Sequence, residues 1–519
     1  MPISRRTLFG ATAAGAAVAA LGTSPAAADT GLRVDGAAWR ELRRVLSPTA
    51  RLSPGLDPTG CAPVDNQRYA FPPPIREVVC QTEQDVVNAV KWCVTNDVEF
   101  RLRSGGHNYA GYSTLADGVV ICMGQGMRRL DPDDGLLHVG GGATNSDVYA
   151  NKHLNLYFPG GRCPTVGVAG LTLGGGLGFN DRKWGLTCDS LVGTNVVLAN
   201  GELVRATESE HADLFWACRG GAGGNFGVNT SFTFNVQRVD GLSATVFDLY
   251  FRPEQGVTVV QELQHLLETD HHNDLDVRIG FKHPRRRAEF PGGPFLRVLG
   301  QRFGSKADLL DRFRGLLMLN PQPQFIDEFG FWPAQEYLLE KPEAKECYYT
   351  KSLMPRTWLE ADSLTTITQW IRQWDEGSAQ ADGYVTLFAM GGATATIGEH
   401  DTAFPHREAT FAIDIGTRWA PDTPAGEEEP LLDQVRALYG DLSRQLHTRA
   451  AFVNFPDPEL RRWSDAYYGP NYARLLDVKQ MYDPHNRFRY PQSIGAPESR
   501  TAPARGRAHS PGDPGLALR

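Results

Sequence analysis

Two glycine-rich stretches each surround one nucleophilic side chain. The first, RSGGHNYAGYS, covers residues 103–113 and contains His107, and the second, GGRCPTVGVAGLTLGGGLG, covers residues 160–178 and contains Cys163. Glycine lets backbone amide groups approach a ligand closely and adopt positive φ, and converging amide groups bind phosphate or pyrophosphate. An imidazole and a thiol beside two such loops indicate a large phosphorylated cofactor that is attached at two side chains.

A carboxylate lies on one face of a predicted strand in FPHREATFAIDIG, residues 404–416. Alternation with a period of two, as in a β-strand, separates an apolar face from a second face. The apolar face carries Phe411, Ile413 and Ile415, and the second carries Thr410, Ala412 and Asp414. A carboxylate in so apolar a strand is partly desolvated, which raises its pKa toward a value useful for proton transfer. Asp414 is therefore a candidate general base, and the alternative is an aspartate that faces solvent or forms a salt bridge.

The elements that position these residues follow from periodicity and turn chemistry. Thr82 is the predicted N-cap of a helix whose apolar residues recur at helical spacing. Predicted strands lie at 98–102, 118–122 and 137–141, with a helix near 146–153. Asn200-Gly201 joins two β-rich runs, which predicts a type I′ hairpin turn because that turn needs positive φ twice. Strands and helices interleave up to residue 240, which predicts an α+β cofactor domain.

The pattern changes between residues 241 and 455. Strand-like runs at 245–251, 384–390 and 410–415 alternate with helices at 306–318 and 358–374. This order predicts a second domain that binds the substrate and is built on an antiparallel sheet with helices over one face.

Length, charge and the N-terminal residues limit the functions open to the chain. Its 519 residues suffice for two or three domains, and its net charge of −8 includes no long basic block, which argues against nucleic acid as the main partner. SRRTLF at residues 4–9 precedes an Ala/Gly-rich run that ends in Ala26-Ala27-Ala28. This predicts a twin-arginine signal peptide that is recognised by the twin-arginine export machinery and cleaved before Asp29. A membrane anchor is the alternative, but the run is shorter than the ~20 apolar residues that a span needs.

The eight cysteines contain no CxxC pair and no zinc-type spacing. Cys93 in the predicted helix and Cys122 in a predicted strand are interpreted as core residues. With Cys163 set aside for chemistry, seven cysteines remain, so at least one is free or paired between molecules, and a disulfide elsewhere stays open. No metal site is predicted, because the histidines at 271, 272 and 283 have no metal-like spacing with carboxylates.

Three separated motifs make the chain resemble the berberine-bridge-enzyme-like branch of the FAD-linked oxidases, within the vanillyl-alcohol-oxidase superfamily. They are the two glycine stretches and NYARLLDVKQMYDPHNRFRYPQSI at residues 471–494. The resemblance covers roughly residues 70–240 and 400–494. It implies an FAD attached twice, through His107 to the flavin 8α-methyl carbon and through Cys163 to flavin carbon 6.

The resemblance also implies the other cofactor contacts, position by position. A pyrophosphate loop comes from the first stretch, close backbone approach from the second, an adenine-side contact from a third glycine-dense turn, and contacts to the isoalloxazine ring from the C-terminal motif. The residues of the pyrophosphate loop are Arg103, Ser104, Gly105, Gly106, Asn108 and Ser113, and those that allow close backbone approach are Gly167, Gly170, Gly174, Gly175, Gly176 and Gly178. The adenine-side contact is made by Gly227 and Val228, and the contacts to the isoalloxazine ring are made by Tyr490 and Gln492.

The tyrosines that often act as base in this family are absent from the chain. Many bacterial relatives carry YxNYxD, whereas residues 452–457 read FVNFPD, with Phe452 and Phe455 at the tyrosine positions. A further tyrosine that some relatives place after GGG is Leu177 here. Since neither phenylalanine nor leucine can exchange a proton, the proton-transfer scheme that relies on these tyrosines does not apply.

The replacement candidates are Asp414, Tyr384 and Tyr468. Plant relatives carry an active-site Glu or Gln at the position of Asp414. Some relatives place an active-site tyrosine on the strand of Tyr384, for which the alternative is an ordinary sheet aromatic. Tyr468 belongs to a YYG motif of the family, and this motif also suits structural packing.

Together these features predict an exported FAD-dependent oxidase. An alcohol, sugar or secondary metabolite gives a hydride to flavin N5, and dioxygen is reduced to hydrogen peroxide. The alternatives are a dehydrogenase with another electron acceptor and a flavin-binding protein with a non-redox cyclase or binding role. The predicted divisions are a signal peptide at 1–28, an arm at 29–70, a PCMH-type FAD-binding domain at 71–240, a substrate domain at 241–455, a segment at 456–495 that returns to the FAD domain, and a disordered tail at 496–519.

Overall fold

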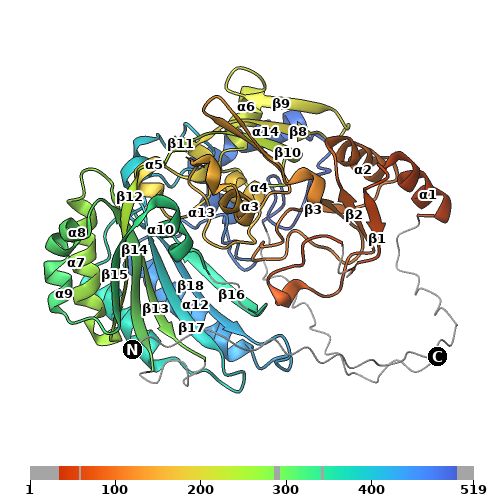
Figure 1. Ribbon diagram of the computed structural model, residues 1–519. Coiled ribbons are helices and arrows are strands. Elements are labelled where there is room, and N and C mark those ends of the chain that lie inside the picture. The colour runs from red at the N-terminus through yellow and green to blue at the C-terminus, as the bar shows by residue number, and fades with distance from the viewer. Residues whose placement is uncertain (1–33, 56, 58–59, 286–292, 341–343, 499–519) are drawn as a thin grey trace, which may run out of the picture.

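The computed structural model describes residues 34–55, 57, 60–285, 293–340 and 344–498. These residues form two halves that lie side by side (Figure 1). One half contains two smaller sheets and the C-terminal segment, and the other contains one large sheet. The α+β class is confirmed. The predicted signal peptide and residues 499–519 of the predicted tail lie outside the described residues.

The first sheet leads directly into the first glycine stretch. Its order is β1-β2-β4-β3, with β2, β4 and β3 parallel and β1 antiparallel. The strands are β1 (Arg51–Ser53), β2 (Arg76–Cys80), β3 (Phe100–Arg103) and β4 (Val119–Met123). Thr82 caps α2 (Glu83–Thr95) as predicted, and Asp85 completes a reciprocal capping box. Because β3 ends at Arg103, the glycine loop begins at the carboxyl end of a parallel strand.

The segment predicted as an N-terminal arm contains regular structure. Helix α1 (Gly36–Val45) packs against α2, where the ring centroids of Trp39 and Trp92 lie 4.6 Å apart, and β1 pairs with β2. Leu42 is fully buried in the same cluster. These apolar side chains make the segment part of the first sheet's core.

The second sheet is antiparallel, in the order β5-β6-β10-β8-β9. Its strands are β5 (Leu130–Asp133), β6 (Leu136–Gly140), β8 (Leu191–Val197), β9 (Leu203–Thr207) and β10 (Val228–Asn235), beside the short pair β7 (Leu156–Tyr157) and β11 (Gln237–Arg238). The helices of this half are α3 (Asn145–Ala150), α4 (Val168–Leu173), α5 (Asp181–Trp184) and α6 (Ala212–Ala217).

The hairpin between β8 and β9 differs from the predicted type I′ turn. Only Gly201 of the Asn-Gly pair has a positive φ, at +76°. Gly201 N donates to Leu198 O at 2.8 Å, and Leu198 N donates to Glu202 O at 2.8 Å. This is a type I turn followed by a glycine bulge, which needs one left-handed residue instead of two.

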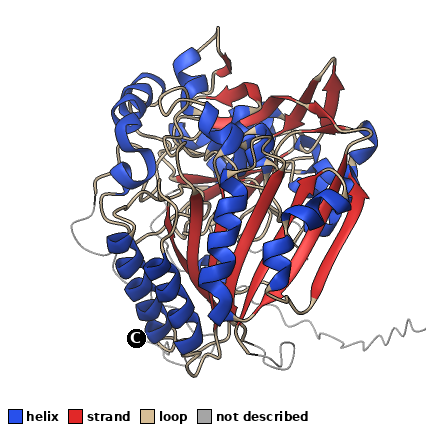
Figure 2. Ribbon diagram, turned by 90° about the vertical axis from the view of Figure 1, so that its left-hand side faces the viewer, coloured by secondary structure: helices blue, strands red, loops and turns tan. Residues whose placement is uncertain are grey.

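The large sheet is antiparallel, and helices cover one of its faces as predicted (Figure 2), except that α10 (Phe331–Leu338) packs on the opposite face of β12 and β14. Its order is β15-β12-β14-β13-β17-β18-β16. The strands are β12 (Ser243–Phe251), β13 (Leu275–His283), β14 (Phe295–Phe303), β15 (Gln324–Gly330), β16 (Cys347–Leu353), β17 (Asp382–Ala389) and β18 (Phe411–Trp419). The helices of this half are α7 (Gly256–Glu268), α8 (Lys306–Arg312), α9 (Arg314–Met318), α10 (Phe331–Leu338), α11 (Ala361–Gln373) and α12 (Glu429–Gln445). The predicted apolar face of β18 packs into the core beneath α7, α11 and α12, so its other face is free to line a site.

The C-terminal segment returns to the cofactor half. Helices α13 (Trp463–Tyr468) and α14 (Tyr472–Tyr482) share a core with the second sheet. Beyond α14, Tyr490 stacks on Tyr112 of the first glycine stretch with centroids 5.2 Å apart. The C-terminal segment therefore reaches the first glycine stretch.

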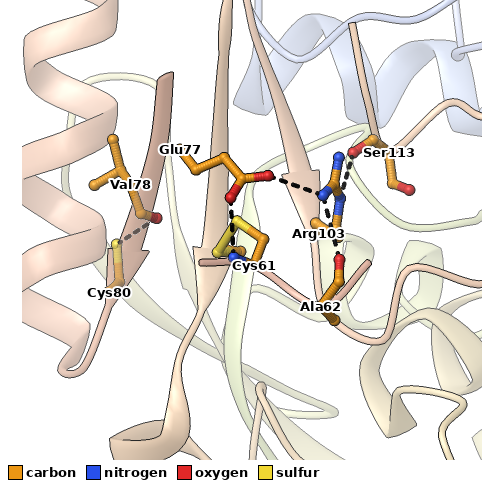
Figure 3. Close-up of a disulfide and its surroundings, with 8 residues drawn as sticks. Cys61, Ala62, Glu77, Val78, Cys80, Arg103 and Ser113 are labelled. Atoms are coloured by element: carbon orange, nitrogen blue, oxygen red, sulfur yellow. Dashed lines mark hydrogen bonds and ion pairs between the residues drawn. A yellow bond between two sulfur atoms is a disulfide. The ribbon is translucent and has the colours of Figure 1, made fainter. Parts of the chain in front are cut away.

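A disulfide between Cys61 and Cys122 ties the N-terminal segment to β4 (Figure 3). The interpretation of Cys122 as a plain core residue is wrong, because its thiol is used in this bond, whereas Cys93 is free and buried. Next to the bond, Glu77 accepts from Cys61 N at 3.1 Å and pairs with Arg103 at 3.2 Å. Arg103 also donates to the carbonyl oxygens of Ala62 and Ser113, so its buried side chain holds the loop in place.

Candidate active site

A cavity of about 1290 Å³ lies between the two halves. Both glycine stretches, the C-terminal segment and the free face of the large sheet line it. It brings together the predicted attachment residues His107 and Cys163 with the candidate catalytic residues Asp414, Tyr384 and Tyr468. Among the described residues, no group of three or more His, Cys, Asp or Glu side chains could hold a metal ion, and no helix is long and apolar enough to span a membrane.

Most of the predicted cofactor contacts line this cavity. They are Arg103, Ser104, Gly105, Gly106, Asn108, Ser113, Gly167, Gly170, Gly227, Val228, Tyr490 and Gln492. Gly174, Gly175, Gly176 and Gly178 do not line it. A Cβ at Gly174 would clash with Asn454, and one at Gly178 would clash with the carbonyl oxygen of Gly160. These glycines let the second stretch pack closely against its surroundings.

Open space and unpartnered polar atoms at the cavity suit a large polar ligand. A Cβ at Gly170 would meet nothing within 4 Å, and one at Gly224 would come no closer than 3.7 Å to any side chain. In the first glycine stretch, three buried polar groups that line the cavity have no hydrogen-bond partner in the described chain, namely Arg103 Nη2, Tyr112 Oη and Ser113 Oγ, and Arg162 Nε and Nη1 of the second stretch have none either. Because buried polar atoms are rarely left unpaired, a glycine-lined trough with free polar groups fits the FAD that the motifs predict.

His107 has a partner at each ring nitrogen. Nε2 lies 2.8 Å from Thr165 Oγ1, and Nδ1 lies 3.5 Å from Asp65 Oδ2. Burial lowers the pKa of His107, although the charge of Asp65 opposes this. The ring is therefore neutral at neutral pH, as a nucleophile must be. Thr165 belongs to the second glycine stretch, so the two predicted attachment loops are in direct contact.

The thiol of Cys163 is held by a carboxylate from the other half. Its Sγ donates to Glu340 Oε2 at 2.7 Å. Burial, followed by the charge of Glu340, raises the pKa of Cys163 well above its usual value. Burial alone would raise the pKa of Glu340 too, but Arg278 and Arg162 hold it well below its usual range. Cys163 is thus a thiol that faces an ionised carboxylate.

Asp414 lies on the free face of β18, as the alternation predicts, and faces the cavity. It is 5% exposed, and Thr350 Oγ1 on β16 donates to its Oδ1. Burial raises the pKa of Asp414 to about 6, against the lowering effects of the Thr350 hydrogen bond and of Arg418. The carboxylate is therefore ionised near neutral pH and remains basic enough to accept a proton.

The other two catalytic candidates have different surroundings. Tyr384 on β17 is cross-strand to Gly416 on β18. Arg418 Cζ lies over the ring of Tyr384, 5.5 Å from the ring centroid. Burial and the nearby Asp414 raise the pKa of Tyr384, so its hydroxyl keeps its proton. Tyr468 is fully buried in the core of the cofactor half, and its hydroxyl donates to Gly221 O at 3.4 Å. Its contacts are those of a packing residue at the cavity wall.

The residues at the missing tyrosine positions form an apolar wall. Leu177, Phe452 and Phe455 pack together with Phe388 in one buried cluster that contacts the cavity. Tyr109 stacks on Phe455, with centroids 5.2 Å apart and an interplanar angle of 9°. Aromatic rings thus remain at two of these three positions, Phe452 and Phe455, but neither ring carries a hydroxyl.

Several cavity residues lie outside the sequence-based predictions. Tyr109 and Tyr348 meet edge to face with centroids 5.0 Å apart, and the charge of Asp414 contributes to the raised pKa of Tyr109. Tyr109 comes only two residues after His107, and Arg418 continues the period-two face of Asp414, so both had a signal in the sequence. Asp65, Glu340 and Tyr348 belong to segments with no motif.

Comparison with known proteins places this site in a family. The family described as "FAD binding domain" matches residues 74–207, and that described as "Berberine and berberine like" matches residues 451–495. The uncharacterized FAD-linked oxidoreductase YgaK of Bacillus subtilis is 33% identical over 433 residues, which are 80% of this chain and 90% of YgaK. The chain belongs to the berberine-bridge-enzyme-like family of FAD-linked oxidoreductases.

Solved structures share the fold of this berberine-bridge-enzyme-like protein. Chitooligosaccharide oxidase has a TM-score of 0.76 at 23% identity and covers 89% of this chain and 100% of its own. Glucooligosaccharide oxidase from Acremonium strictum, which holds a 6-S-cysteinyl, 8α-N1-histidyl FAD, has a TM-score of 0.76 at 21% identity and covers 87% and 98%. At this level of identity the likeness establishes the fold, and the predicted PCMH-type FAD-binding architecture is confirmed.

Proposed function

We propose that this FAD-linked oxidoreductase is an exported oxidase with doubly attached FAD. The enzyme takes a hydride from a carbon that bears a hydroxyl group. It then passes the electrons to dioxygen, which is reduced to hydrogen peroxide. One observation carries the proposal. A single cavity holds an imidazole, a thiol and a desolvated carboxylate, His107, Cys163 and Asp414, beside a glycine-lined trough.

The chain's residues divide between holding the cofactor and handling a proton. When bound, the flavin supplies the hydride acceptor. His107 and Cys163 would hold it covalently, the loop at 103–113 would bind its pyrophosphate, and Tyr490 and Gln492 would contact its ring. Asp414 accepts the hydroxyl proton of the substrate as the C–H bond is broken, which favours hydride departure. Tyr384 keeps its proton and hydrogen-bonds the same oxygen.

A sugar is the substrate class that we propose. The two oxidases named above act on oligosaccharides by their names. Here the cavity is also lined by three aromatic rings, Tyr250, Phe295 and Tyr337, together with paired charged side chains such as Arg297 and Asp248. Aromatic faces and planar polar groups suit the apolar and hydroxyl faces of a sugar ring. Export, which the N-terminal residues predict, agrees with the Cys61–Cys122 disulfide, a bond typical of oxidising compartments.

The experiment starts with attachment. Purified protein is denatured in acid, and the flavin that stays with the polypeptide is counted by intact mass and located by peptide mass. We expect one FAD linked at both His107 and Cys163. H107A and C163A should each keep a single link, and the double variant should release all flavin on denaturation. Flavin retained by the denatured double variant would contradict the assignment.

Activity is tested on the same preparation. Mono- and oligosaccharides are screened for peroxide release in air and for reduction of an artificial electron acceptor without oxygen. Peroxide release supports an oxidase. Turnover with the artificial acceptor alone would make the protein a dehydrogenase, and no flavin reduction by any sugar would remove the sugar from the proposal.

A further inference from the structure

Each attachment residue faces a carboxylate that comes from outside both glycine stretches. Asp65, in the N-terminal segment, faces the Nδ1 of His107, and Glu340, just after α10, accepts from the Sγ of Cys163. The two acids lie at separate places along the cavity wall and serve different nucleophiles. These two acids bear on how the cofactor becomes attached, and this inference rests on the proposed double attachment.

The surroundings of His107 determine which ring nitrogen carries the proton. The Asp65 carboxylate, 3.5 Å from Nδ1, can only accept, which favours the tautomer with the proton on Nδ1 and with Nε2 accepting from the Thr165 hydroxyl. Asp65 itself is held in place, since its backbone N donates to Gly106 O at 3.0 Å and Tyr348 Oη donates to its carboxylate at 3.4 Å. The Cys61–Cys122 disulfide anchors the segment four residues earlier.

The surroundings of Cys163 fix both its thiol and the backbone before it. Glu340 N donates to Arg162 O at 3.1 Å, while the Glu340 carboxylate accepts from the Cys163 thiol. Arg278 pairs with the same carboxylate. This pairing keeps Glu340 ionised but also makes it a weak base, so the carboxylate takes the thiol proton only as the S–C bond forms.

We propose that Asp65 and Glu340 are the proton acceptors for the two attachment reactions, Asp65 for His107 and Glu340 for Cys163. At His107, one N–H and one C–H of the flavin 8α-methyl group are replaced by an N–C bond. At Cys163, one S–H and the C–H of flavin carbon 6 are replaced by an S–C bond. Each reaction releases two protons and two electrons, and dioxygen takes them to give one hydrogen peroxide. The nucleophile's proton leaves through its own acid.

The test measures attachment at each residue separately. Wild type, D65N and E340Q are purified, incubated with FAD in air, digested at intervals and analysed by peptide mass for flavin on His107 and on Cys163. Loss of a positioned base typically slows a reaction about 10²- to 10⁴-fold. We expect D65N to slow linkage at His107 by about 100-fold without changing linkage at Cys163, and E340Q to do the reverse.

Each variant controls for the other, and both preserve the fold's contacts. An asparagine at 65 can still accept from Tyr348, and a glutamine at 340 can still accept from Arg278. The total flavin released by acid plus that retained on the chain reports whether the variant folds and binds FAD. E336Q changes a carboxylate that lines the same cavity but pairs with Lys152 instead of an attachment residue, and it should link at the wild-type rate.

Three results would decide against the inference. Wild-type linkage rates in D65N and E340Q would remove both acids from the reaction. Slow linkage at both residues in either single variant would mean that the acid acts on the whole site instead of on its own nucleophile. If wild type itself carries no covalent flavin, the proposed double attachment fails first, and this outcome is distinct because it needs no variant.

Discussion

At the scale of single residues, Asp414 is the side chain whose protonation state should control turnover. Burial raises the pKa of Asp414 to about 6, so a base at this position becomes active as the pH rises through that value. We expect kcat/KM for flavin reduction by the sugar substrate to rise across about pH 6 in wild type. D414N should lower it about 10²- to 10⁴-fold and abolish this rise.

Thr350 offers a sharper check of the same assignment. Its hydroxyl donates to Asp414 and lowers the pKa of that carboxyl. T350V keeps the side-chain shape and removes the donor, so the pH at which kcat/KM rises should move upward. A profile that keeps its wild-type position in T350V would mean that another group titrates, and the tyrosines around the cavity would then have to be varied.

Among the elements, β18 has room for no side chain at Gly416, because the ring of Tyr384 on β17 lies next to it. Gly416 is cross-strand to Tyr384, and a Cβ at Gly416 would lie 2.5 Å from Tyr384 Cζ and 2.9 Å from Tyr349 O. G416A should therefore displace Tyr384 and destabilise the protein by about 1–3 kcal/mol, as overpacked cores do. Urea denaturation measures this.

A matched glycine on β13, the other neighbour of β17, provides the control. Gly280 on β13 faces open space, since its Cβ would meet only Arg297 O, at 4.0 Å. G280A should leave the free energy of unfolding unchanged or raise it slightly, because alanine restricts the unfolded chain. Equal destabilisation by both substitutions would show that loss of glycine, and not contact with Tyr384, is responsible.

Local patterns predict the elements and the faces of the strands, but not the partners across the cavity. The helix after Thr82, the face of Asp414 and both glycine loops follow from spacing within a few residues. Glu340 meets Cys163 across 177 residues of sequence, and Thr350 meets Asp414 across 64. No periodicity encodes such pairs, because packing of the large sheet against the cofactor half creates the first, and the pairing of β16 with β18 creates the second. The Cys61–Cys122 bond likewise joins two residues, 61 apart in the sequence, that no local pattern pairs.

At the scale of the whole molecule, two buried aspartates meet where the halves join. Asp181 on α5 and Asp276 on β13 each have a carboxylate oxygen without a hydrogen-bond partner in the described residues, Oδ1 and Oδ2 respectively. Burial, aided for Asp181 by the charge of Asp276, raises the pKa of both. The folded protein therefore keeps protons at this joint that the unfolded chain has lost above about pH 4.

This difference sets the sign of a pH effect on stability. Because the folded state binds more protons, the free energy of unfolding must fall as the pH rises from about 4 through the raised pKa values. D276N removes one of the two ionisable groups and keeps an oxygen that can accept from the backbone amides of Asn180 and Arg182, which contact Asp276. We expect D276N to have a higher thermal midpoint than wild type at pH 8 and a smaller drop between pH 5 and pH 8. D181N should behave in the same way, since either change relieves the same repulsion. If D276N is instead less stable at pH 8, Asp276 is ionised and its attraction to Arg182 outweighs the repulsion, and the joint between the halves is then held by an ion pair.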